Sequence, residues 1–117
     1  MRPTSIAEKE TAALQAYVSS LQEHFGPRLV DVLLFGSQAR GEARPGSDID
    51  VVVTLDHPDP QDLSFARGLA FDIWLSHQVF LSVRAMSREG WQHLAAMQSL
   101  FYRNVIHDGI SLIPAKA

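Results

Sequence analysis

The sequence contains no cysteine, which excludes disulfide bonds and metal sites built on thiolates. An excess of basic residues is also absent, because 10 lysines and arginines stand against 13 aspartates and glutamates, for a formal net charge of −3. This overall charge does not indicate a protein that coats DNA or RNA, although a local basic site stays possible. A cytoplasmic location is consistent with these features, and we expect it.

Long apolar runs are missing as well. No stretch approaches the roughly 20 apolar residues that a membrane span requires, so we expect no membrane association. Residues 1–5 lack the apolar centre of a signal peptide. The chain has 117 residues, of which 46% are apolar, and this is sufficient for one hydrophobic core. We therefore expect a single domain over residues 1–117.

What the sequence does contain is a clear series of helical and strand patterns. The spacing of apolar residues predicts a first helix over about residues 5–25, which Gly26-Pro27 ends. Short apolar runs predict buried strands at Leu29–Phe35, Ile49–Leu55 and Val79–Val83.

Further helices are predicted between and after the strands. Asp59, followed by proline, predicts the start of a helix that joins the second and third strands. Ser87 predicts the start of the next helix, which is expected to break near residues 96–99. Residues 110–113 could add an edge strand.

This order of elements predicts an α/β (α+β) fold, in which helices pack on a small mixed β-sheet. The second and third strands are joined by a full helix, so they should be parallel. The first and second strands have a connection too short for a full crossover, so they should be antiparallel. The end of the first strand and the starts of the other two should then lie together at one edge of the sheet.

Two acids open the second strand. Asp48 and Asp50 are two residues apart, so their side chains should point to the same face. Two ionised carboxylates a few ångströms apart repel each other unless a cation neutralises them. Such oxygen ligands suit Mg²⁺ or Mn²⁺, which also bind water and substrate phosphates. We interpret the pair as metal-binding catalytic residues; the alternative is a pair of caps on a solvated strand.

The segment before these acids is suited to phosphate. Gly36 lets a phosphate approach the backbone, and a short helical turn expected over residues 37–43 offers free N–H groups. The hydroxyl of Ser37 adds a donor or caps this turn. Arg40 and Arg44 could balance phosphate charge. Metal carboxylates that face a phosphate cradle are the parts of phosphoryl or nucleotidyl transfer.

The same stretch resembles the signature of the polymerase-beta-like nucleotidyltransferase superfamily, in particular its minimal single-domain members. The likeness rests on Gly36-Ser37, ten intervening residues that include Ala39-Arg40-Gly41 and Ser47, and then Asp48-Ile49-Asp50. It implies a palm-like domain that uses two divalent metals to transfer a nucleoside monophosphate from a nucleoside triphosphate such as ATP. By resemblance, Asp48 and Asp50 would hold the metals, and Gly36, Ser37, Arg40 and Ser47 would bind the nucleotide.

One part of the family pattern is missing. Active members of the superfamily usually carry a third carboxylate on the strand beside the Asp-x-Asp strand. The expected positions hold Phe80 and Ser82, and no acid occurs between Asp72 and Glu89. Asp72, near the end of a predicted helix that returns to this edge, is the remaining candidate.

These observations lead to alternative functions. The first is a metal-dependent nucleotidyltransferase that modifies a protein or a small molecule. Some minimal members of the superfamily are similar to antitoxins that adenylylate a HEPN-domain ribonuclease, so the resemblance implies a HEPN-domain partner. The second, motivated by the missing acid, is a catalytically weak or inactive module that acts by occluding its partner. A structural homo-oligomer is a third interpretation.

Overall fold

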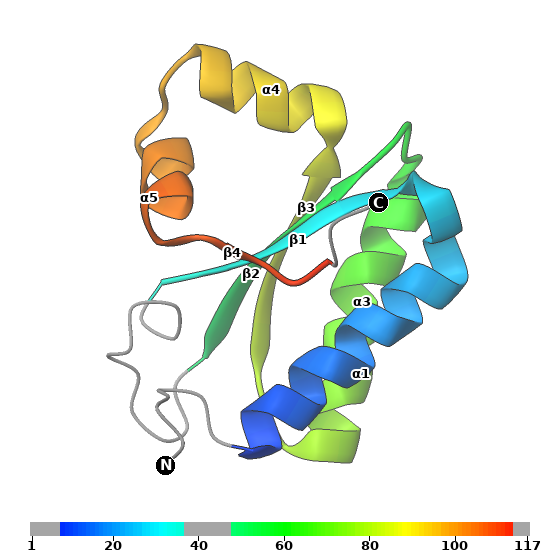
Figure 1. The fold of residues 1–117 in the computed structure, drawn as a ribbon. Coiled ribbons are helices and arrows are strands. Elements are labelled where there is room, and N and C mark those ends of the chain that lie inside the picture. The colour runs from blue at the N-terminus through cyan, green and yellow to red at the C-terminus, as the bar shows by residue number, and fades with distance from the viewer. Residues whose placement is uncertain (1–7, 37–47, 114–117) are drawn as a thin grey trace.

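The computed structural model describes residues 8–36 and 48–113, and Figure 1 shows how its elements are arranged. The predicted start of the first helix and the predicted turn at residues 37–43 lie outside these ranges. Within them, no helix is both long and apolar enough to cross a membrane. In chain order the elements are α1 (Glu8–Phe25), the 3-10 helix η1 (Gly26–Arg28), β1 (Leu29–Phe35), β2 (Ile49–Leu55), α3 (Pro60–His77), β3 (Leu81–Ser87), α4 (Arg88–Ala96), α5 (Leu100–Asp108) and β4 (Ile110–Ser111).

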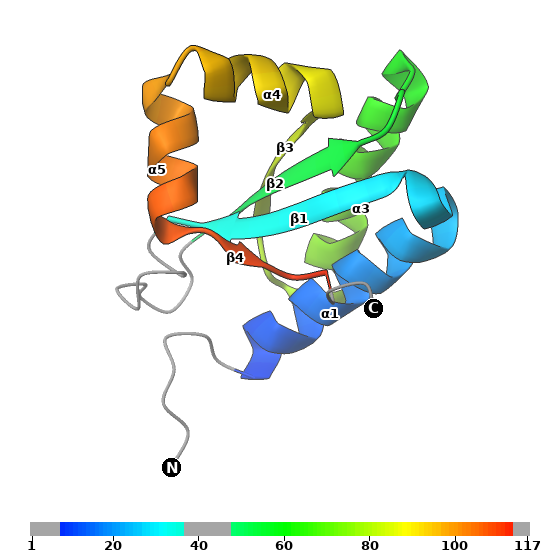
Figure 2. The ribbon, with the colours of Figure 1, turned by 45° about the horizontal axis from the view of Figure 1, so that its top comes forward.

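The strands of the described residues form one mixed sheet in the order β3-β2-β1-β4. β1 and β2 are antiparallel and β2 and β3 are parallel, so both predicted directions are confirmed. β4 pairs with β1 at the edge of the sheet (Figure 2), which confirms the expected edge strand in a shorter form. The predicted fold class, helices packed on a small mixed sheet, is therefore confirmed.

Local hydrogen bonds explain where α3 and α4 begin. The side chain of Asp59 accepts a hydrogen bond from the backbone N–H of Asp62, and the side chain of Asp62 accepts one from the backbone N–H of Asp59. This reciprocal pair is a capping box. The hydroxyl of Ser87 accepts a hydrogen bond from the backbone N–H of Gly90 over 2.9 Å. Both predicted helix starts are therefore confirmed.

The predicted bounds of the third strand were wrong. β3 runs over Leu81–Ser87 rather than Val79–Val83. Gln78, with φ 58°, ends α3 in the left-handed conformation. The strand starts at Leu81 because Leu81 is in register with Ile49, the first residue of β2. The strand extends through the polar Arg84, and its pairing with β2 continues to the last residue of both strands. Alternate side chains of an edge strand can face solvent, so a polar residue does not end the strand.

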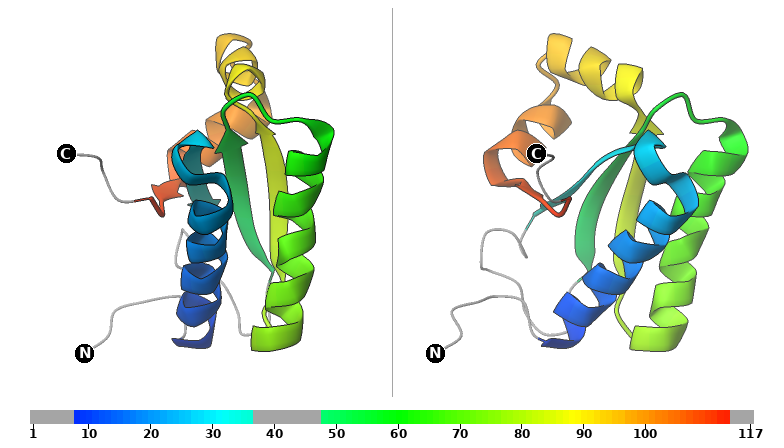
Figure 3. Two further views of the ribbon diagram at one scale, coloured as in Figure 1. Left: turned by 90° about the vertical axis from the view of Figure 1, so that its right-hand side faces the viewer. Right: turned by 45° about the vertical axis from the view of Figure 1, so that its right-hand side comes forward.

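The two faces of the sheet have different neighbours. Ile49 and Leu81 face the hydrophobic core formed with α1 and α3, which lie side by side along that face (Figure 3). α5 lies on the other side of the sheet (Figure 1), where Phe101 contacts Phe35 edge-on. Because side chains alternate along β2, Asp50 belongs to this second face.

A buried tyrosine joins the two helices that cover the core. Tyr17 of α1 is fully buried, and its hydroxyl donates a hydrogen bond of 2.7 Å to the backbone carbonyl of Ala66 in α3. Burial raises the pKa of the Tyr17 hydroxyl well above its usual range, because a phenolate there would lose its hydration. Tyr17 therefore stays neutral at pH values that ionise it in the unfolded chain.

We expect Tyr17→Phe to lower the free energy of unfolding by about 1 kcal/mol at neutral pH, because the hydrogen bond is lost. In the original protein, the unfolded chain releases this proton near pH 10 and the folded protein keeps it. The stabilising effect of the protonated Tyr17 hydroxyl is therefore complete below about pH 10 and declines above that pH. Urea unfolding at neutral and alkaline pH measures both effects. An equal alkaline loss of stability in the two proteins would contradict this role of Tyr17.

Candidate functional site

Three strand ends meet at one edge of the sheet, as the sequence predicts. Asp50 is in register with Phe35 of β1 on one side and with Ser82 of β3 on the other. Gly36 directly follows Phe35, and Asp48 directly precedes β2. Gly36, Asp48 and Asp50 are therefore brought together, although they are separated by a long connection in the chain.

The backbone of Gly36 lies directly against the carboxylate of Asp50. A Cβ atom at position 36 would be 2.6 Å from Oδ2 of Asp50, which is closer than real side chains approach. Gly36 also has φ 80°, a conformation that glycine adopts without the steric penalty of a side chain. Both observations explain why this position holds glycine.

The two acids lie at the start of β2, and Asp50 projects on the side away from the core. Ile49, which lies between them, is fully buried, and alternation directs Asp50 to the opposite face. Asp50 is half-buried, whereas Asp48 is exposed. Together they form a small negative area that could hold one divalent cation, with water and substrate oxygens as its remaining ligands.

The other predicted nucleotide-binding residues, Ser37, Arg40 and Ser47, lie outside the described ranges. Arg44, which could balance phosphate charge, lies outside them as well. Their roles stay predictions. Among the described residues, the chemistry of this edge therefore rests on a glycine backbone and two carboxylates.

The neighbouring strand brings no acid to this face. Ser82 is the residue in register with Asp50, and Phe80 stacks on Trp74 of α3 with ring centroids 4.0 Å apart. Asp72 is exposed on α3, which packs against the opposite face of the sheet, so it does not supply the third carboxylate. Over residues 8–36 and 48–113, no three histidine, aspartate or glutamate side chains are grouped so that they could hold a metal.

One charged residue of this face is not among the predicted site residues. Arg84 lies two residues after Ser82 on β3, so its side chain belongs to the face of Asp50. Its guanidinium carbon lies 5.2 Å from the centroid of the Phe101 ring. The predicted strand ended at Val83, and this excluded Arg84. The alternation of apolar residues at 81, 83 and 85 with polar residues at 82 and 84 was the available signal.

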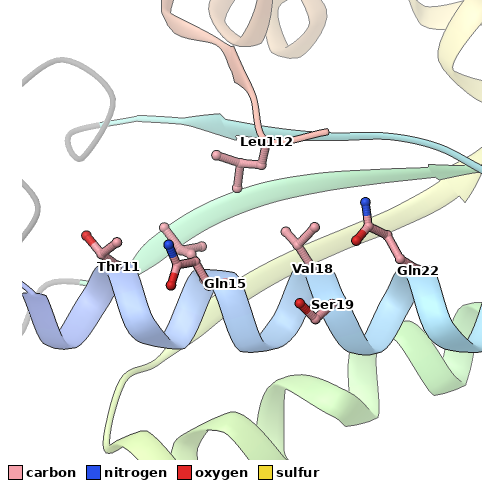
Figure 4. A pocket seen from close by; sticks show the side chains of 7 residues that line it. Thr11, Gln15, Val18, Ser19, Gln22 and Leu112 are labelled. Atoms are coloured by element: carbon pink, nitrogen blue, oxygen red, sulfur yellow. The ribbon is translucent and has the colours of Figure 1, made fainter. Parts of the chain in front are cut away.

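A pocket of about 370 Å³ lies elsewhere, between the outer flank of α1 and the residue that follows β4 (Figure 4). Because α1 covers the face opposite to Asp50, this pocket is separate from the candidate site. The described residues that line it are Thr11, Leu14, Gln15, Val18, Ser19, Gln22 and Leu112, and none of these has an ionisable side chain.

Comparisons with known proteins show the family and the fold. The nucleotidyltransferase domain family model matches residues 14–104. A Methanocaldococcus jannaschii protein named putative protein adenylyltransferase is 28% identical over 100 residues, 86% of this chain and 94% of that protein. A solved structure of a putative minimal nucleotidyltransferase is 30% identical with a TM-score of 0.59, covering 91% of this chain and 97% of that one.

A structure of the tri-AMPylated HEPN toxin of Shewanella oneidensis in complex with MNT antitoxin shows the same fold. Its matching chain is 17% identical with a TM-score of 0.53, and the match covers 92% of this chain and 73% of that chain. The family match includes the elements that carry Gly36, Asp48 and Asp50. This chain belongs to the nucleotidyltransferase domain family. The resemblance to minimal nucleotidyltransferases is thus confirmed, and the protein is a nucleotidyltransferase.

We expect Gly36→Ala to lower the free energy of unfolding by about 1–3 kcal/mol, because the methyl group would collide with Asp50 in a strained backbone conformation. Gly68→Ala is the matched control: a Cβ at position 68 in α3 meets no atom within 4 Å. This control should gain about 0.5–1 kcal/mol from helix propensity. Urea unfolding measures both, and equal stability of the two variants would contradict the close contact at Gly36.

Proposed function

We propose that this protein is a metal-dependent adenylyltransferase that transfers AMP from ATP to a protein, and that the acceptor is a HEPN-domain partner. The observation that carries the proposal is the contact of the Gly36 backbone with Asp50, beside Asp48, in a chain of the nucleotidyltransferase family. This arrangement places two carboxylates suited to a divalent cation at the start of β2, against the glycine backbone that follows β1.

In the proposed reaction, a hydroxyl oxygen of the acceptor attacks the α-phosphorus of ATP. A new P–O bond forms to the acceptor, the bond between the α-phosphorus and the bridging oxygen to the β-phosphate breaks, and pyrophosphate leaves. The hydroxyl proton passes to solvent. A bound Mg²⁺ or Mn²⁺ would neutralise phosphate charge and orient the triphosphate. Asp48 and Asp50 would hold that ion, and the lack of a side chain at Gly36 would let the Asp50 carboxylate lie close against the end of β1.

The names of related proteins support the choice of acceptor. The relative from Methanocaldococcus jannaschii is named as a protein adenylyltransferase, and the Shewanella oneidensis complex contains an AMPylated HEPN toxin with its antitoxin. We therefore infer that this chain acts as the antitoxin of such a pair. Adenylylation of the toxin would be its means of neutralisation.

The test is transfer of label from α-labelled ATP and Mg²⁺ to a co-expressed HEPN-domain protein. Asp48→Asn combined with Asp50→Asn should abolish the transfer, since the carboxylate charge that holds the ion is removed. Asp72→Asn is the matched control, because Asp72 is exposed on α3 beyond the opposite face, and it should retain activity. Label transfer by the double variant would remove the two aspartates from the mechanism.

The alternative function is neutralisation by occlusion, without chemistry. The observation that favours it is the absence of an acid on β3, where Ser82 is in register with Asp50. The same double variant separates the two functions, since an occluding module would still bind and inhibit its partner. Loss of neutralisation with an intact complex would instead support catalysis.

Ser82→Asp provides a further prediction about metal binding. A carboxylate in register with Asp50, on the same face, would add a third acid to the pair. We expect it to raise the affinity for Mn²⁺ roughly tenfold, since divalent-ion affinity depends on the charge of the ligand set. Ser82→Asn is the neutral control. Titration calorimetry with Mn²⁺ alone measures the change, and equal affinities in the two variants would show that this position does not face the ion.

A further inference from the structure

Arg84 places a positive charge on the same face of the sheet as the two carboxylates. It is in register with Val52, the residue two positions after Asp50, and it follows Ser82 by two positions on β3. Because both strands alternate with the same period, Asp50, Val52, Ser82 and Arg84 share one face. Gly36 lies on the β1 side of Asp50 and Arg84 lies on the β3 side. The Asp50 carboxylate therefore lies between the backbone of Gly36 and the strand that carries the positive charge of Arg84.

One aromatic ring contacts the guanidinium, and a second ring packs against the first. The central carbon of the guanidinium lies 5.2 Å from the centroid of Phe101 in α5, a distance typical of a cation–π contact. Phe101 in turn packs edge-on against Phe35, with centroids 5.6 Å apart and an interplanar angle of 89°. Since Phe35 is in register with Asp50, these contacts direct Arg84 across β2 toward the Asp50 end of the sheet.

The hydrogen-bonding capacity of Arg84 is not used by the protein within the described residues. Arg28 forms an ion pair with Asp62 over 2.9 Å, and Arg88 lies 3.7 Å from Asp56. Arg84 forms no ion pair with an acid anywhere in ranges 8–36 and 48–113, and it is exposed. The contact with the Phe101 ring is not a hydrogen bond, so the N–H donors of the guanidinium remain available to an anion.

We propose that Arg84 binds a phosphate group of the nucleotide, an inference that rests on the proposed function. The chemistry that fits is a phosphoryl oxygen, which the planar guanidinium can contact with two N–H donors. Arg84 thereby contributes positive charge at the strand that lacks the third acid. Phe101 is a positioning residue in this proposal, because it contacts the guanidinium of Arg84 and acts on the phosphate through it.

The experiment measures the binding of Mg-ATP and of adenosine by titration calorimetry, without any acceptor. Arg84→Gln should weaken ATP binding about tenfold, since a charge-assisted hydrogen bond is lost, and should leave adenosine binding unchanged. Arg84→Lys should retain part of the affinity. The matched control is Arg67→Gln, on α3, which covers the opposite face of the sheet; its affinity for ATP should equal that of the original protein.

The outcomes separate this inference from the proposed function. ATP binding by the original protein, with equal affinity in Arg84→Gln, would overturn the role of Arg84 and leave the nucleotidyltransferase proposal standing. Absence of ATP binding in the original protein would overturn both. Phe101→Leu provides an independent readout. Added to Arg84→Gln, it should cause little further loss of ATP affinity, because the guanidinium that Phe101 positions is already absent. Additive losses of affinity would contradict positioning through Arg84. Thermal unfolding identifies any variant that fails to fold.

Discussion

The contact between the backbone of Gly36 and the carboxylate of Asp50 constrains the rest of this structure. It requires that β1 and β2 pair with Phe35 opposite Asp50. A shift of one residue in the register of β2 against β1 would turn Asp50 toward the core and expose Ile49, because the side chains of a strand alternate. The register that buries Ile49 therefore also presents Asp50 beside Gly36. Stability of the core and geometry of the candidate site depend on the same pairing.

The two faces of the sheet separate stability from chemistry. One face is buried beneath α1 and α3, whose packing includes the hydrogen bond from Tyr17 to Ala66. The other face carries Asp50 and Arg84 beside the fully buried Val52, so changes at the two charged positions leave the core beneath α1 and α3 intact. β3 is where such a change is visible, because Ser82 occupies the place beside Asp50 and Arg84 follows it. The face thus has fewer negative charges than the family pattern implies. The strand that lacks the acid, β3, carries the positively charged Arg84.

Local sequence signals determined most of the secondary structure and the location of the candidate site. The bounds of β1 and β2 agree with the predicted Leu29–Phe35 and Ile49–Leu55, because short apolar runs flanked by turn residues report directly on buried strands. The start of α3 at Asp59 was equally clear, since a cap depends only on its nearest neighbours. The spacing of Gly36, Asp48 and Asp50 indicated the nucleotidyltransferase family, which the comparisons confirmed.

Only the tertiary structure decided how β3 contributes to the site. Its pairing with β2 extends the strand beyond Val83 and places Arg84 on the face of Asp50, and no local pattern specifies that pairing. The packing of α3 on the opposite face excluded Asp72 as the third acid, because the side of the sheet that a helix covers depends on contacts distant in sequence. The sequence by itself therefore determined the two acids and the glycine beside them. The residues that face them across the sheet followed from long-range strand pairing and helix packing.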